Sequence, residues 1–144
     1  MHKRIRLGMV GGGQGAFIGA VHRIAARLDD RYELVAGALS SNPERAATSA
    51  NEIGINADRS YADFHKMATA ESKRVDGIEA VSIVTPNHLH AAVSIAFAEA
   101  GIDVICDKPM TFSLEEALEV ANVVKKKWSY FHVDSQLYRL SHDS

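Results

Sequence analysis

A glycine-rich turn follows the first apolar segment and has residue types suited to holding phosphate. Gly11, Gly13 and Ala16 match the spacing G-x-G-x-x-G/A. Because Gly11 and Gly13 have no Cβ, the backbone can turn sharply and approach a pyrophosphate. Amides in the first turn of the next helix would point at the phosphate, with the helix dipole behind them. The candidate contacts beyond the two glycines are Gln14, Gly15, Ala16, Phe17 and Ile18.

The surroundings of this turn favour a dinucleotide as its ligand. Residues 5–10 form a short apolar run, and residues 16–30 carry apolar side chains at helical spacing. A strand that enters such a turn and a helix that leaves it are the context the motif requires. A plain tight turn, another nucleotide and the S-adenosylmethionine of methyltransferases remain alternatives at this point.

The end of the second apolar segment bears on which dinucleotide would bind. A carboxylate at this position typically binds the ribose 2′-hydroxyl of NAD. The sequence instead has Ser40, Ser41 and Asn42, and Arg45 follows closely enough to pair with the 2′-phosphate of NADP. We therefore expect NAD or NADP, with the alternative that Arg45 is an ordinary solvated helix residue.

The third apolar segment also ends in polar residues. Thr85, Pro86 and Asn87 follow it directly, where they could line the nicotinamide side of a bound dinucleotide. His88 and His90 come next, but side chains two positions apart at a helix start diverge, and no Cys or Glu cluster accompanies them. We expect no metal site here.

A lysine follows the fourth apolar segment. Lys108 lies between Asp107 and Pro109, which restrict its position. Lysines at strand ends are usually solvated. A partly desolvated one can hold a substrate hydroxyl or share in proton transfer.

Strands and helices that alternate along the chain must position these residues. The strands are apolar on both faces, which is typical of a parallel sheet covered on both sides. The sequence therefore predicts an α/β fold, a doubly wound parallel sheet with helices on both faces. The predicted strands are residues 5–10, 32–40, 78–86 and 102–107, and the predicted helices are residues 16–30, 43–53, 61–74, 88–101 and 113–127.

The composition excludes several classes of protein. The chain has 144 residues, enough for one domain and too few for two of ordinary size. A net charge of −2 with scattered basic residues favours neither a nucleic-acid partner nor a membrane surface. Cys106 is the one cysteine, so no intrachain disulfide can form, and a cytoplasmic location is expected.

Taken together, the segments MVGGGQGAFIGAVH, SIVTPNHLH and CDKP resemble the cofactor domain of the glucose-fructose oxidoreductase / inositol dehydrogenase / rhizopine-catabolism (GFO/IDH/MocA) oxidoreductases. This resemblance runs from about Arg4 to Lys126 and implies a Rossmann fold. It implies that Thr85, Pro86 and Asn87 contact the cofactor with His90 nearby, and that Lys108 lies between nicotinamide and a substrate hydroxyl.

Two features depart from the family pattern. Asp107 replaces the usual glutamate, and the glycine loop before His22 is longer than usual. The resemblance implies hydride transfer between the nicotinamide and a secondary alcohol of a sugar, cyclitol or related polyol. A non-catalytic nucleotide-binding or redox-sensing module is the alternative.

The C-terminal segment is unlike the family. We expect residues 1–127 to be the NAD(P)-binding domain and residues 128–144 to be an aberrant tail, part of which could pair as an edge strand. The family's second domain, which carries further catalytic residues, is expected to be missing. The fragment would then show little or no turnover, and its exposed surface would favour self-association.

A shifted reading frame would account for this tail. One permitted coding of residues 125–144 reads KKSGLIFTLTHNYTGYPMIR in another frame, which resembles a family continuation. Lys125, Lys126 and Lys127 can be encoded by a run of adenines, where an extra base is easily gained. We therefore expect a frameshift there, which the nucleotide sequence tests; a native short protein with an unusual tail is the alternative.

Overall fold

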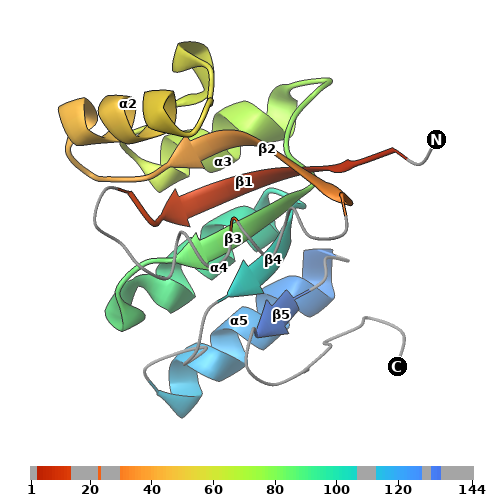
Figure 1. Cartoon of the computed structure of the whole chain (residues 1–144). Helices are drawn as coiled ribbons and strands as arrows, with labels where there is room; N and C mark the ends of the chain where they lie inside the picture. The colour runs from red at the N-terminus through yellow and green to blue at the C-terminus, as the bar shows by residue number, and fades with distance from the viewer. Residues whose placement is uncertain (1–2, 14–22, 24–29, 107–112, 128–130, 134–144) are drawn as a thin grey trace.

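The computed structural model describes residues 3–13, 23, 30–106, 113–127 and 131–133. Within these residues, five parallel strands form one sheet in the order β2-β1-β3-β4-β5 (Figure 1). The strands are β1 (Ile5–Gly11), β2 (Tyr32–Ala38), β3 (Ala80–Val84), β4 (Asp103–Cys106) and β5 (Phe131–Val133). The first four lie where the sequence predicts strands, and β5 occupies one edge of the sheet.

The described helices also follow the sequence prediction. They are α2 (Pro43–Glu52), α3 (Phe64–Lys73), α4 (His90–Glu99) and α5 (Leu114–Lys127), with the short 3-10 helices η1 (Ala57–Arg59) and η2 (Asn87–Leu89). The Asn42 side chain accepts a hydrogen bond from the Arg45 amide and so caps the N-terminus of α2. Ser113 likewise accepts from the Glu116 amide at the start of α5. The helix predicted between β1 and β2 lies outside the described residues except at Arg23.

Each face of the sheet has its own apolar cluster. On one face, Met9 and Leu39 pack with Ala50 of α2 and with Ile55. On the other face, strand residues such as Val81 and Val104 pack against α3, α4 and α5, with Phe97 fully buried. The prediction of a doubly wound parallel sheet with helices on both faces is therefore confirmed.

The strand order reverses beside β1. β2 pairs with one side of β1, and β3 pairs with the other. Figure 1 shows that the connection from β2 passes through α2 and α3 before it reaches β3. This is the switch point at which doubly wound sheets bind ligands, beyond the carboxyl ends of the strands. No helix in the described part of the chain has both the length and the hydropathy needed to span a membrane.

Candidate functional site

The glycine turn begins with a close backbone approach at the switch point. Gly11 ends β1 with φ +80° and pairs with Val84 of β3. A Cβ at Gly11 would lie 2.9 Å from the Val84 carbonyl oxygen and 3.1 Å from the Thr85 amide nitrogen. Both the left-handed backbone and this contact exclude a side chain here. The carboxyl ends of β1 and β3 are therefore held directly against each other.

Gly13, two residues after Gly11, brings the turn against the chain that follows β2. A Cβ at Gly13 would lie 2.8 Å from the Leu39 carbonyl oxygen and 3.0 Å from the Ser49 hydroxyl oxygen. Ser49 belongs to α2 and is buried. The turn thus lies between the end of β3 on one side and the chain after β2 with α2 on the other, the location that the sequence predicts for a pyrophosphate site.

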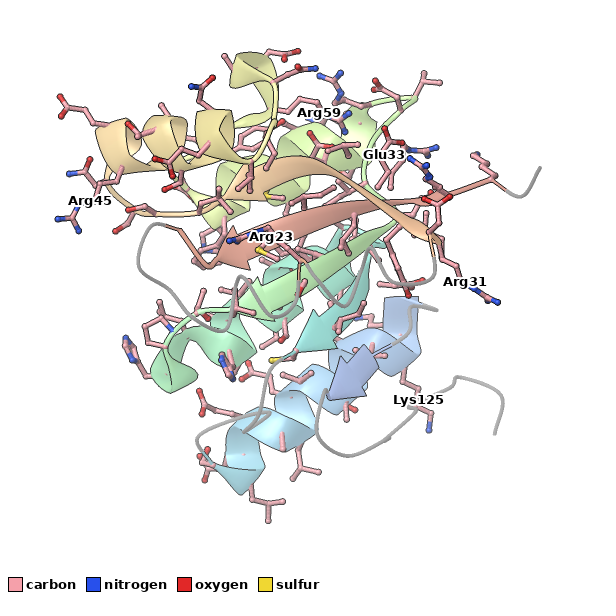
Figure 2. The ribbon with its side chains drawn as sticks, viewed as in Figure 1. Arg23, Arg31, Glu33, Arg45, Arg59 and Lys125 are labelled. Carbon is pink, nitrogen blue, oxygen red and sulfur yellow. The ribbon has the colours of Figure 1, made fainter. Side chains whose placement is uncertain are left out.

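Arg23 is a further residue beside the turn, which the sequence analysis does not identify. Its Nη1 donates to the Gly12 carbonyl oxygen at 2.9 Å and lies 3.7 Å from the Met9 sulfur. Figure 2 shows Arg23 over the carboxyl half of β1. The guanidinium holds the turn and places a positive charge near it, which favours an anionic ligand. No motif in the sequence marks this residue, because one arginine within a helical pattern looks like any solvated one.

The residues predicted to meet the adenosine ribose lie together after β2. Ser40 is half-buried, and its hydroxyl oxygen accepts from the Asn42 amide at 3.1 Å. Ser41 and Arg45 are exposed, and Figure 2 shows Arg45 projecting outward from α2. The only carboxylate in this segment is Glu44, which is exposed in the first turn of α2. These residues therefore form a polar segment with no acidic side chain directly at the carboxyl end of β2.

The residues after β3 form a second polar end beside the turn. The Thr85 hydroxyl oxygen is buried and has no hydrogen-bond partner among the described residues. His90 is fully buried, and its Nε2 lies 2.8 Å from the Thr85 carbonyl oxygen. Pro86 and His88 are exposed, so the two histidines face different surroundings, as their spacing predicts. Asn87 begins η2.

Part of the predicted site lies outside the described residues. This applies to the turn residues Gln14, Gly15, Ala16, Phe17 and Ile18, and to Asp107, Lys108 and Pro109. The residue before Asp107 shows from which edge of the sheet this segment starts. β4 ends at Cys106, which pairs with Ile83 of β3, so the chain continues from the same edge as Thr85. Among the described residues, no three His, Cys, Asp or Glu side chains gather in a group that could hold a metal ion.

The described geometry fits a dinucleotide. The turn has two positions, Gly11 and Gly13, at which a side chain would clash with neighbouring backbone, so the turn packs tightly against the chain after β3 and β2, as the first turn of a dinucleotide-binding fold does. The buried Thr85 hydroxyl, which has no hydrogen-bond partner in the part of the chain that the structure describes, lies beside it, and buried polar groups normally have one. A bound cofactor would supply such a partner.

Sequence comparison assigns the chain to a family. The model of the GFO/IDH/MocA family, described as an oxidoreductase family with an NAD-binding Rossmann fold, matches residues 5–135. The chain belongs to this family, and the resemblance found in its Thr85 and Lys108 segments is confirmed.

Individual relatives agree with this assignment. YfiI, an uncharacterized oxidoreductase of Bacillus subtilis (strain 168), is 41% identical over 126 residues, which cover 87% of this chain and 32% of YfiI. An oxidoreductase from Sinorhizobium meliloti has a crystal structure with a TM-score of 0.87 and 57% identity, covering 92% of this chain and 36% of that protein.

A third relative was solved with ligands. The inositol dehydrogenase homolog from Azotobacter vinelandii, complexed with NADH and myo-inositol, gives a TM-score of 0.89 and 39% identity. The match covers 93% of this chain and 35% of that protein. The chain thus spans about a third of the length of these relatives.

Proposed function

We propose that this chain binds a nicotinamide dinucleotide across the carboxyl ends of β2, β1 and β3. The observation that carries the proposal is the glycine turn at the switch point, where Gly11 packs against the backbone of Val84 and Thr85 as only a residue without a Cβ can; turns of this kind bring backbone amides to a pyrophosphate. The pyrophosphate would lie at this turn, near the positive charge of Arg23. The adenosine would extend toward β2 and the nicotinamide toward β3.

Both NAD and NADP are compatible with the residues at the end of β2. No acidic side chain at this strand end would repel a 2′-phosphate. The Ser40 hydroxyl can donate a hydrogen bond to either a ribose hydroxyl or a phosphate. Arg45 is exposed and can turn toward a 2′-phosphate. Glu44 beside it opposes a second negative charge. We infer a chain that accepts both cofactors, with Arg45 contributing to the affinity for NADP.

The reaction we propose for the whole protein is oxidation of a secondary alcohol of a sugar, cyclitol or related polyol. The bound nicotinamide would supply the hydride acceptor. Lys108, in the chain that continues from β4, would hold the reacting hydroxyl and assist in moving its proton. Support comes from the family's oxidoreductase description and from the relative solved with NADH and myo-inositol.

The 144 residues by themselves are expected to bind the cofactor with little or no turnover. The relatives are about three times as long, and the family resemblance assigns further acid–base residues to their second domain. Of the groups that the proposed reaction needs, this chain would supply the cofactor site and Lys108. We therefore expect these 144 residues to bind the cofactor without catalysing the reaction.

Fluorescence titration with NADH and NADPH tests the proposal. We expect saturable enhancement or shift of the nicotinamide emission with both, and no oxidation of a panel of sugars and polyols that includes myo-inositol. S-Adenosylmethionine should not displace NADH. A chain that ignores both dinucleotides, or that prefers S-adenosylmethionine, would contradict the proposal; turnover of a polyol would contradict only the expectation of an inactive fragment.

A further inference from the structure

The buried imidazole of His90 makes a hydrogen bond to the polypeptide backbone beside the proposed cofactor site. His90 is the first residue of α4 and has no exposed surface. Its Nε2 lies 2.8 Å from the Thr85 carbonyl oxygen. A carbonyl oxygen can only accept, so Nε2 carries the hydrogen of this bond. The sequence position explains the geometry, because a side chain in the first helical turn points back toward the residues before the helix.

The backbone after β3 is short of hydrogen-bond donors near Thr85. Pro86 follows it and has no amide hydrogen, so the turn after β3 lacks one of its backbone donors. The next bond in this turn runs from the Leu89 amide to the Pro86 carbonyl oxygen at 2.9 Å and does not include Thr85. On the opposite side, Thr85 lies against Gly11. Its peptide is thus held between the glycine turn and His90.

The hydroxyl of Thr85 is the group whose position this arrangement determines. It is buried and has no partner among the described residues. A buried hydroxyl without a partner is costly, so a ligand atom that completes it gains affinity. Because the adenosine half of a dinucleotide lies toward β2, the end of β3 lies next to the nicotinamide half.

We propose that His90 is a positioning residue for the nicotinamide half of the cofactor, acting through Thr85 rather than by touching the cofactor. Its Nε2–H holds the Thr85 carbonyl, which sets the Thr85 hydroxyl at the nicotinamide side. This inference rests on the proposed dinucleotide binding. It predicts that loss of this hydrogen bond weakens binding of the nicotinamide half of the cofactor and leaves binding of the adenosine and pyrophosphate half unchanged.

Two variants of the full chain, each titrated with two ligands, test this prediction. His90→Phe keeps a ring in the buried space but removes the donor, whereas His90→Gln places an amide N–H near the position of Nε2. NADH probes the whole site, and ADP-ribose, which lacks nicotinamide, probes the other half alone. Calorimetric titration should show NADH affinity falling about tenfold in His90→Phe, with ADP-ribose changed less than about twofold. His90→Gln should restore most of the NADH affinity.

A matched control lies one turn further along α4. Ser94 is fully buried, and its hydroxyl also lacks a partner among the described residues, so no hydrogen bond of this side chain to Thr85 is present there. Ser94→Ala should leave both affinities unchanged. If His90→Phe fails to fold, His90→Asn replaces it, because its shorter amide cannot reach the Thr85 carbonyl; that variant must then lose NADH affinity where His90→Gln does not.

The outcomes separate the two proposals. Equal losses for NADH and ADP-ribose, or no loss in any donor-free variant, would overturn the positioning role while leaving cofactor binding intact. A wild-type chain that binds neither ligand would instead overturn the proposed function, and the inference with it. Loss of NADH affinity alone, recovered by glutamine, is the result we expect.

Discussion

The guanidinium of Arg59 and the carboxylate of Glu71 form an ion pair in the protein interior. The Glu71 side chain has no exposed surface and that of Arg59 has 7%. Glu71 also accepts from the Ile78 amide at 3.1 Å and from the Tyr61 hydroxyl at 2.8 Å. Arg59 in turn donates to the Asp76 carbonyl oxygen at 3.0 Å. The pair therefore joins η1, α3 and the residues just before β3, all within the crossover that leads from the end of β2 to the start of β3.

Breaking this pair should destabilise the fold strongly. Glu71→Ala leaves the Arg59 charge buried and the Ile78 amide without its acceptor, so we expect a loss of about 3–5 kcal/mol in the free energy of unfolding. Urea unfolding followed by circular dichroism measures it. Asp30→Asn is the control, since Asp30 pairs with Arg4 at 2.8 Å with both side chains about half exposed or more, and should cost under about 1 kcal/mol. Similar losses in both variants would be inconsistent with a special role for burial.

Stability should also fall at high pH because of Tyr61. Burial raises the pKa of Tyr61 to about 12, assisted by its hydrogen bond to Glu71 and by the negative charge there. In the unfolded chain this hydroxyl titrates near its ordinary value of about 10. The protonated form is thus favoured by folding, and its contribution is fully present below about pH 10 and lost as the pH rises through about 12.

The Tyr61→Phe variant tests this pH dependence of stability. The urea midpoint of the wild type should decline between about pH 10 and 12 more steeply than that of Tyr61→Phe, which cannot titrate there. At pH 7 the variant lacks only the bond to Glu71, so it should be destabilised by about 1 kcal/mol. Parallel pH profiles for the two proteins would show that Tyr61 does not titrate differently in the folded state.

Two glycines with the same backbone separate strain from close approach. Gly11 and Gly54 have φ of +80° and +83°, but a Cβ at Gly54 would have no atom within 4 Å. Gly54→Ala should therefore cost about 1 kcal/mol of stability and leave NADH affinity unchanged. Gly11→Ala adds the contact with Val84 and should lower NADH affinity about tenfold or more. Calorimetric titration of both variants decides; unchanged affinity in Gly11→Ala would argue against phosphate binding at this turn.

The sequence predicts the elements and the polar strand ends well, because both depend on local patterns. Alternation of apolar runs with helical spacing identifies the first four strands, β1 to β4, and Asn42 caps the start of α2 by accepting from an amide only three residues further along the chain. The predicted helix at 61–74 begins later, at Phe64, because Asp63 caps it by accepting from the His65 and Lys66 amides. The local sequence pattern is therefore enough to predict where these strands and helices lie.

The contacts around the site could not be predicted in the same way. His90 meets Thr85, and Arg23 meets Gly12, only once the turns after β1 and β3 have their final backbone course. The Arg59–Glu71 pair is likewise invisible in a charge pattern, since charged residues on a helix are usually solvated. These positions depend on tertiary packing, and a sequence motif carries no information on it.

Arg45 should affect one cofactor and not the other. It is exposed near the end of β2, so Arg45→Gln removes a charge without disturbing the core (Figure 2). We expect NADPH affinity to fall about three- to tenfold and NADH affinity to stay the same, with the NADPH effect decreasing at high salt. Fluorescence titration measures both. Glu44→Gln is the neighbouring control and should improve NADPH slightly; equal effects of Arg45→Gln on both cofactors would mean that the residue does not meet the 2′-phosphate.

The exposed face of α5 leads to a prediction about assembly. Leu114 and Leu118 are 75% and 59% exposed and lie one helical turn apart, so they form one apolar surface. We expect the chain to self-associate at high concentration through this surface. Sedimentation should show a shift toward monomer when both leucines are replaced by serine. Val75, fully exposed in the α3–β3 connection, supplies the control, because a single apolar side chain buries too little area to hold two copies together. Val75→Ser should therefore sediment like the wild type, whereas a wild type that remains monomeric at all concentrations would refute the expected association.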